Sequence, residues 1–183
     1  IQEGHAAIVE ALLQAGTDID KAGNDGTTAL MIASQCGHDA IVEALLQSGA
    51  DVNKATNNGG TALMMASLTG HGAIVEVLLQ AGADIDKAND NGATALIVAS
   101  EKGDIASVKA LIQAGADVDK ANNDGTTALI AASQEGHAAI VDALIQAGAD
   151  IDKANSDGTT ALIMASLKGH TAIFEALVQA GAG

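Results

Sequence analysis

Five histidines recur at one position of a repeated pattern, and imidazole is a side chain that binds metals and transfers protons near neutral pH. They are His5, His38, His71, His137 and His170. Helices packed side by side lie about 8–10 Å apart, whereas two ligands of one Zn²⁺ ion each need a bond of about 2 Å. If each histidine begins a helix in a stack, neighbouring imidazoles cannot easily share an ion. The pattern therefore favours a repeated polar position over a metal site.

Paired aspartates form a second repeated pattern, which resembles the opening of a calcium loop. The pairs are Asp18/Asp20, Asp84/Asp86, Asp117/Asp119 and Asp150/Asp152. The position of the third calcium ligand holds alanine in each copy, and the closing glutamate is missing. We therefore expect solvated rows of charge, in which a parallel row of lysines offsets part of the acidic one. These lysines are Lys21, Lys54, Lys87, Lys120 and Lys153.

Nucleophiles are present, but nothing pairs them with a base. Cys36 is the single cysteine, and a serine recurs at one position in five copies (Ser34, Ser67, Ser100, Ser133, Ser166). An active site needs one set of unlike groups that converge at one place, whereas these residues repeat. We therefore predict that the protein is not an enzyme and holds no catalytic residue, metal or cofactor.

Turn signals and caps divide the chain into short elements. Asn123-Asp124-Gly125 is typical of a tight turn, because Asn and Asp tolerate left-handed backbone and Gly adopts it without steric cost. A threonine suited to cap a helix follows each turn, and the apolar run after it ends at a glycine, as at Gly37. A second apolar run such as 41–46 ends at Gly49, and the segment after it is too short and broken for a helix. Each copy thus predicts a helix, a turn, a helix, an extended arm and a hairpin.

This order of elements and the 33-residue period resemble the ankyrin repeat. The Thr-Pro-Leu-His-x-Ala motif of that family is similar to Thr-Ala-Leu-Met-Ile-Ala at Thr28–Ala33, and its Gly-Ala-Asp-Val-Asn stretch matches Gly49–Asn53. Two departures recur: the proline is alanine, and the motif histidine is apolar, which predicts a drier seam between units. The apolar replacements are Met31, Met64, Ile97, Ile130 and Ile163.

The resemblance implies an all-α repeat solenoid of stacked helix-turn-helix units with β-hairpin-like loops, as one domain over 1–183. A partial repeat over 1–23 precedes repeats over 24–56, 57–89, 90–122 and 123–155, and a last repeat covers 156–183. Helices of two or three turns are marginal alone, so each unit must be ordered by its neighbours. Neither end carries the polar substitutions of a cap. We therefore expect end-to-end self-association through the terminal repeats, or a longer array.

Composition excludes several classes of partner. The net charge of −15 repels phosphate backbones, so we expect no nucleic acid. No apolar run is long enough to span a membrane. The single Cys36 fits a reducing compartment, which favours an intracellular location, cytoplasmic or nuclear.

The resemblance also implies a function: a non-enzymatic scaffold that binds a protein partner through its concave face and hairpin tips. The tip residues at matching positions are Asn24, Asp25, Thr27, Asn57, Asn58, Gly60, Asp90, Asn91, Ala93, Asn123, Asp124, Thr126, Ser156, Asp157 and Thr159. The residues at the end of the first helix are Gln35, Cys36, Leu68, Thr69, Glu101, Lys102, Gln134, Glu135, Leu167 and Lys168. Of these, Leu68 and Leu167 are apolar where three copies carry Gln or Glu. The tips are otherwise uniform, which favours the alternative of a structural spacer or an idealised, consensus-like array with no evolved partner.

Three further positions break the repeat. Ser107 replaces an isoleucine while Ile105 appears two residues earlier, and we expect that helix to survive. Phe174 replaces a valine and is expected to fill core, or to cover part of the open side of the last unit. The resemblance implies that Asn53 matches a position that is hydroxylated in some members of the family.

Overall fold

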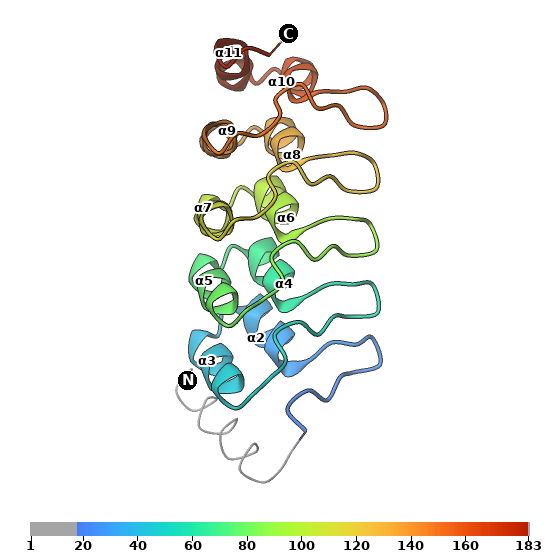
Figure 1. Cartoon of the computed structure of the whole chain (residues 1–183), viewed down its shortest axis with the longest axis vertical. Helices are drawn as coiled ribbons and strands as arrows, with labels where there is room; N and C mark the ends of the chain where they lie inside the picture. The colour runs from blue at the N-terminus through green and yellow to red at the C-terminus, as the bar shows by residue number, and fades with distance from the viewer. Residues whose placement is uncertain (1–17, 183) are drawn as a thin grey trace.

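The computed structural model describes residues 18–182, which form an elongated stack of helix pairs with one loop per pair projecting to the same side (Figure 1). The first helices of the pairs are α2 (Ala29–Cys36), α4 (Ala62–Thr69), α6 (Ala95–Lys102), α8 (Ala128–Glu135) and α10 (Ala161–Lys168). The second helices are α3 (Asp39–Gln47), α5 (Gly72–Gln80), α7 (Ile105–Gln113), α9 (Ala138–Gln146) and α11 (Thr171–Gln179). The predicted all-α repeat solenoid is confirmed. The partial repeat falls largely on residues 1–17, outside the described part.

The first helices begin and end where the sequence predicts. The hydroxyl of Thr28 accepts a hydrogen bond from the backbone N–H of Met31 (3.4 Å), and the threonine before every later first helix does the same. Each of these helices ends at a glycine in the left-handed region, for example Gly37 with φ 73°. Glycine adopts this conformation without the steric cost of a Cβ atom. Local sequence therefore fixes both ends of each first helix.

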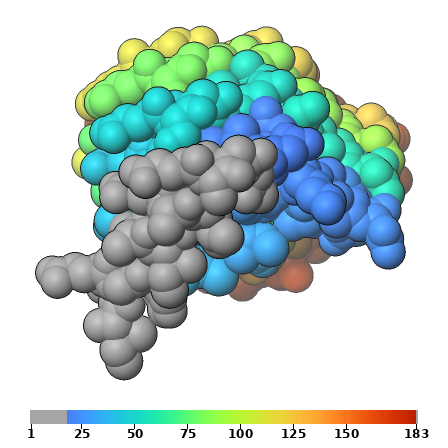
Figure 2. Space-filling model, turned by 90° about the horizontal axis from the view of Figure 1, so that it is seen from below, coloured from blue at the N-terminus to red at the C-terminus, as the bar shows by residue number. Residues whose placement is uncertain are grey.

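Burial between units orders the stack. First helices contact first helices and second helices contact second helices along the array, so that successive units lie one behind another in the end view of Figure 2. Val75, Val108 and Val141 in the second helices are completely buried. Because each apolar face is covered by the next unit, the short helices are stable only together.

The seam between first helices is dry, as the loss of the motif histidine predicts. Met31, Met64, Ile97 and Ile130 are all buried. Ile163, at the same position in α10, is 44% exposed because no described helix lies on its far side. Burial of such a side chain contributes about 1.5–3 kcal/mol. The last unit lacks this contribution.

The projecting loops are hairpins that join one another through the backbone. Within one hairpin, the N–H of Thr56 donates to the carbonyl of Gly60 (2.9 Å), and the described residues form isolated bridges but no extended strand. Between hairpins, Asn57 donates from its backbone N–H to the carbonyl of Asp25 (2.8 Å). The same bond recurs at each later step, from Asp90 to Asn58, from Asn123 to Asn91 and from Ser156 to Asp124. The hairpins are thus a continuous hydrogen-bonded row.

The predicted extended arm is wrong in detail, because each arm contains a turn. In the arm after α3, the N–H of Asn53 donates to the side chain of Asp51 (2.9 Å) and the N–H of Lys54 to its carbonyl (3.3 Å). Short Asx turns of this kind satisfy backbone donors locally. The aspartates of the arm therefore shape it.

The expectation of purely solvated charge rows is also wrong. The carboxylate of Asp86 accepts a hydrogen bond from the N–H of Asp117 in the next unit (3.1 Å). Lys120 Nζ donates to the backbone carbonyl of Asp86 (2.7 Å), and Lys87 and Lys153 make the same contact with the preceding arm. These charges hold successive arms together through charge-assisted bonds to backbone groups.

Candidate protein-interaction surface

The recurring histidines link units. His71, His137 and His170 precede second helices, yet their rings make no capping bond to their own helix. Nε2 of each ring lies 3.1–3.2 Å from a backbone carbonyl near the end of the first helix of the preceding unit. Because a carbonyl only accepts, Nε2 must carry the proton. Residues 18–182 contain no group of three His, Cys, Asp or Glu side chains placed to hold a metal ion. His5 lies outside the described residues.

Asp104 replaces the histidine in one unit and acts differently. Its carboxylate accepts the N–H of Ala106 (3.2 Å), a capping bond, and also the hydroxyl of Ser107. Ser107 is completely buried, and Val108 beside it remains in the core. The helix survives as α7, as expected, because the two polar replacements satisfy each other.

The repeated serines are structural. Ser34, Ser67, Ser100 and Ser133 are completely buried, and their hydroxyls have no hydrogen-bond partner among the described residues. Ser166, in the last unit, is exposed. None of the four buried hydroxyls is accessible to a substrate.

The hairpin tips form one edge of the array, but their side chains differ in availability. Asn57 and Asn123 donate from Nδ2 to carbonyls of the preceding tip, at 3.0 Å and 2.8 Å, and the Ser156 hydroxyl makes a similar bond. These three side chains hold the row together. The exposed tip residues are Asn24, Asp25, Asn57, Asn58, Asp90, Asn91, Asn123, Asp124, Ser156 and Asp157, whereas Thr27, Ala93, Thr126 and Thr159 are half-buried. Gly60 is buried and, as a glycine, has no side chain to present to a partner.

The ends of the first helices carry the greatest chemical variety. Leu68 is 39% and Leu167 72% exposed. Glu101 and Lys102 form an ion pair with each other (3.0 Å), which leaves little net charge at that unit. Gln35, Cys36, Thr69, Glu135 and Lys168 are exposed, and Gln134 is half-buried. The two leucines lie in α4 and α10, which are not neighbours in the stack, so they do not form one patch.

The acidic tips include one carboxyl with a shifted pKa. The backbone N–H of Thr27, 3.0 Å from Asp25 Oδ1, holds the pKa of the Asp25 carboxyl below its usual value. A hydrogen bond to the ionised form favours that form. Asp25 is therefore a fixed negative charge at the first described tip.

Sequence comparison agrees with this geometry. A family model described as ankyrin repeats (3 copies) matches residues 1–89, 49–122 and 96–183. The chain belongs to the ankyrin-repeat family. A search of curated protein sequences gives no match to it. In residues 18–182 of this ankyrin array, no helix is both long and apolar enough to cross a membrane.

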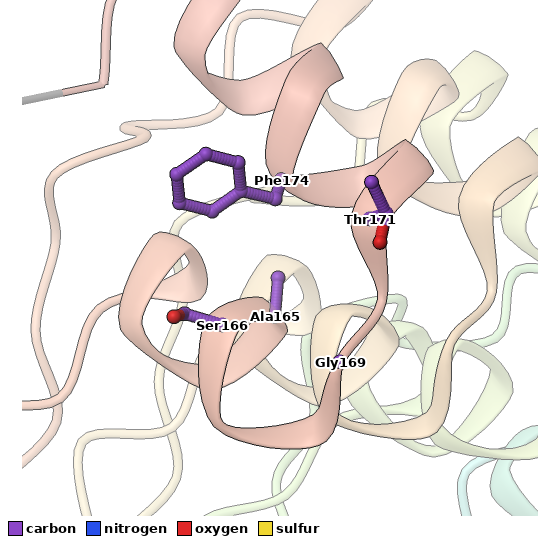
Figure 3. A pocket seen from close by; sticks show the side chains of 5 residues that line it. All are labelled: Ala165, Ser166, Gly169, Thr171 and Phe174. Carbon is purple, nitrogen blue, oxygen red and sulfur yellow. The ribbon is translucent and has the colours of Figure 1, made fainter.

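The last ankyrin unit exposes a shallow pocket. It has a volume of about 220 Å³ and is lined by Ala165, Ser166, Gly169, Thr171 and Phe174 (Figure 3). In the preceding unit, the ring of His170 occupies the equivalent space above Gly136. Phe174, the single phenylalanine of a chain without tyrosine or tryptophan, is 39% exposed beside this pocket. The expectation that Phe174 fills core is therefore wrong.

A second groove lies between the first two described hairpins of the ankyrin array. It has a volume of about 310 Å³ and is lined by Asp25, Thr27, Thr56, Asn57, Asn58 and Met65. The repeat pattern of the sequence does not predict this groove. The available signal is the pair Thr56 and Gly60, because the later hairpins carry Asn at the first position and a residue with a side chain at the second.

The side chain of Asn53, for which the sequence resemblance implies hydroxylation, forms hydrogen bonds through both its amide oxygen and its amide nitrogen. Its Oδ1 accepts the N–H of Asp84 (2.7 Å), and its Nδ2 donates to the carbonyl of Gly82 (3.2 Å). An enzyme acting on Asn53 would have to open this part of the arm first.

Proposed function

We propose that this ankyrin-repeat protein is a non-enzymatic scaffold that binds a protein partner through its hairpin tips and first helices, the concave side in this family. Ankyrin repeats are in general protein–protein interaction modules. One observation supports the proposal most: residues that hold units together are repeated, while exposed residues at the first-helix ends differ from unit to unit. Binding surfaces of repeat proteins are built in this way on a constant frame.

The proposed contacts are the exposed tip residues and the exposed first-helix ends, with Leu68 and Leu167 as apolar anchors. Each leucine is a separate apolar contact among polar residues, and interfaces commonly combine buried apolar contacts with a polar rim. Nucleic acid is an unsuitable partner because the net charge is −15. We also propose an intracellular location, which the single thiol of Cys36 supports.

Affinity capture tests the proposal. The native chain is compared with the double variant Leu68→Glu/Leu167→Glu and with Gln80→Glu/Gln179→Glu, which places the same number of new charges on exposed positions of the second helices in the same two units. We expect a partner that the native chain and the glutamine variant retain and the leucine variant loses. Equal capture by all three proteins would contradict the proposed face.

The alternative function is that of a spacer or idealised array without an evolved partner. The uniform Asn, Asp and Gly chemistry of the tips and the identical bonds between hairpins favour it. Failure of the native chain to capture any specific partner would support this alternative.

We further propose that the 183-residue chain self-associates through the exposed face of its last unit. Ile163, Phe174 and Val178 are between 39% and 48% exposed there, and Leu167 of the same unit is 72% exposed. Light scattering over a concentration series tests this, with Phe174→Glu as the variant expected to remain monomeric. A native chain that is monomeric at every concentration would contradict self-association.

A further inference from the structure

We propose that the groove between the first two described hairpins binds an extended basic peptide segment in which an apolar side chain lies next to Arg or Lys. We call it the Gly60 groove; its lining is Asp25, Thr27, Thr56, Asn57, Asn58 and Met65. This inference rests on the proposed scaffold function and names the chemistry of the partner at one place on the array.

Gly60 lies against residues that line the groove and carries no side chain of its own. A Cβ atom at Gly60 would lie 3.0 Å from Thr56 Oγ1 and 3.2 Å from the terminal methyl of Met65. The residues at the equivalent position of the other hairpins are Thr27, Ala93, Thr126 and Thr159. The hairpin beside the groove, whose volume is about 310 Å³, therefore departs from the repeat at this position.

The surface beside the groove carries several partly exposed apolar side chains. Met65 is half-buried, and Ile32 in α2 and Leu68 in α4 are 52% and 39% exposed. Two units further along, Ala131 takes the place of Met65 and is buried, and Gln134 takes the place of Leu68. An apolar side chain of a partner thus gains more by docking beside Met65 and Leu68 than over the equivalent positions of α8.

The charge beside the groove is negative. Asp25 is exposed on its rim, and its carboxylate accepts the N–H of Thr27 but forms no ion pair with a lysine of the described residues. The tips carry Asp25, Asp90, Asp124 and Asp157 and neither Lys nor Arg. A basic partner is therefore attracted along the whole row, while an acidic partner is repelled.

The occupant fits best as an extended segment. The backbone groups that join the two hairpins are already paired, since Asn57 donates to Asp25 across the floor of the groove (2.8 Å). Recognition must therefore come from side chains: an apolar one over Met65 and a basic one at Asp25. Alternate side chains of an extended peptide point in opposite directions, so residues next to each other can reach the floor and the rim.

The test uses fluorescence anisotropy with three labelled peptides of equal length. The first alternates leucine with arginine, the second has glutamate in place of arginine, and the third has alanine in place of leucine. They are titrated at physiological ionic strength with the native chain, Gly60→Thr, Asp25→Asn and the matched control Asp157→Asn. Gly60→Thr introduces the residue that three other hairpins carry, and its Cβ presses on Thr56 and Met65 in the groove lining, which alters the shape of the groove. The substitution leaves the net charge unchanged.

We expect the leucine–arginine peptide to bind the native chain and Asp157→Asn alike, and to bind Gly60→Thr about tenfold more weakly, equivalent to about 1.4 kcal/mol. Asp25→Asn should weaken binding more than Asp157→Asn does. Circular dichroism establishes that each variant is folded. Equal binding by Gly60→Thr, equal binding of the glutamate or alanine peptide, or no binding of the leucine–arginine peptide would overturn the proposal. If a partner were nevertheless captured through Leu167 alone, the scaffold function would remain supported and only the peptide-binding role of the groove would be contradicted.

Discussion

The imidazole of His137 lies directly over the backbone of Gly103, so that a Cβ atom at Gly103 would come within 2.6 Å of ring atom Cε1. Nε2 of the same ring lies 3.1 Å from the carbonyl oxygen of Glu101. The last carbonyls of a helix have no partner within it, and here the next unit supplies one. The contact gives Gly103 a second reason to lack a side chain, beside its left-handed backbone.

Gly103→Ala is expected to destabilise the protein more than Gly70→Ala. Both glycines have left-handed backbone, with φ 79° and 77°, so both substitutions carry a strain of about 1–2 kcal/mol. Only Gly103 faces a histidine ring; the nearest atom to a Cβ at Gly70 is Asp104 Cγ at 4.0 Å. We expect a further loss of about 1–3 kcal/mol for Gly103→Ala from the forced movement of the ring. Urea denaturation of the two variants measures the difference, and equal losses would contradict a tight ring contact.

Asp104→Ala should cost more than the loss of a helix cap alone. The substitution removes the acceptor of the Ala106 N–H, worth about 1 kcal/mol, and leaves the buried Ser107 hydroxyl unpaired, worth about 1–3 kcal/mol. In a Ser107→Ala background only the cap is lost, so the cost should fall. A double-mutant cycle on the free energy of unfolding measures this coupling. Additive effects would show that Asp104 and Ser107 act independently.

Ser100→Ala is expected to stabilise the protein by about 1 kcal/mol. The Ser100 hydroxyl is completely buried and has no partner among the described residues, and a buried polar group without a hydrogen bond costs free energy. Ser166→Ala is the matched control, because Ser166 occupies the same position and is exposed, so its effect should be close to zero. Thermal and urea denaturation of both variants provide the measurement. A destabilised Ser100→Ala protein would mean that the hydroxyl is paired in solution.

Asp25 should titrate below its ordinary pKa of 3.8 in the folded protein. The Thr27 N–H stabilises the carboxylate, so this contribution to stability is complete above the ordinary pKa and is lost as the pH falls through the lowered one. Carbon-detected NMR of the side-chain carboxyl gives the pKa, and Asp25→Asn identifies its resonance. A pKa at or above 3.8 would contradict the hydrogen bond between Asp25 and Thr27.

The sequence predicts the local elements well because the signals are local. Thr28 as a cap, Gly37 as a left-handed end and the buried Met31 each follow from the residue and its neighbours. The contacts between units do not follow in the same way. The bonds from Lys120 to the Asp86 carbonyl and from His137 to the Glu101 carbonyl span 34 and 36 residues, and the sequence alone does not place those atoms together.

In the candidate site, too, the sequence predicts the local features but not those that depend on packing between units. Exposure of Leu68 and Leu167 is consistent with their place in the pattern, and their role in binding stays a prediction. Gly60 is predicted as a contact residue, yet it is buried and lies against Thr56 and Met65, which line a groove. The boundaries of the repeats likewise remain a prediction. A pattern of residue types identifies positions in the repeat, but the shape of a groove depends on packing between two units.

Hydrogen exchange measured residue by residue tests most directly whether each unit is ordered by the units beside it. Amides of α6, which packs between α4 and α8, should exchange at least about tenfold more slowly than those of α10, whose Ile163 side is open. Protection in α8 should resemble that in α6. If amides of α10 exchange as slowly as those of α6, the units fold without help from their neighbours, which would contradict the claim that each unit is ordered by the units beside it.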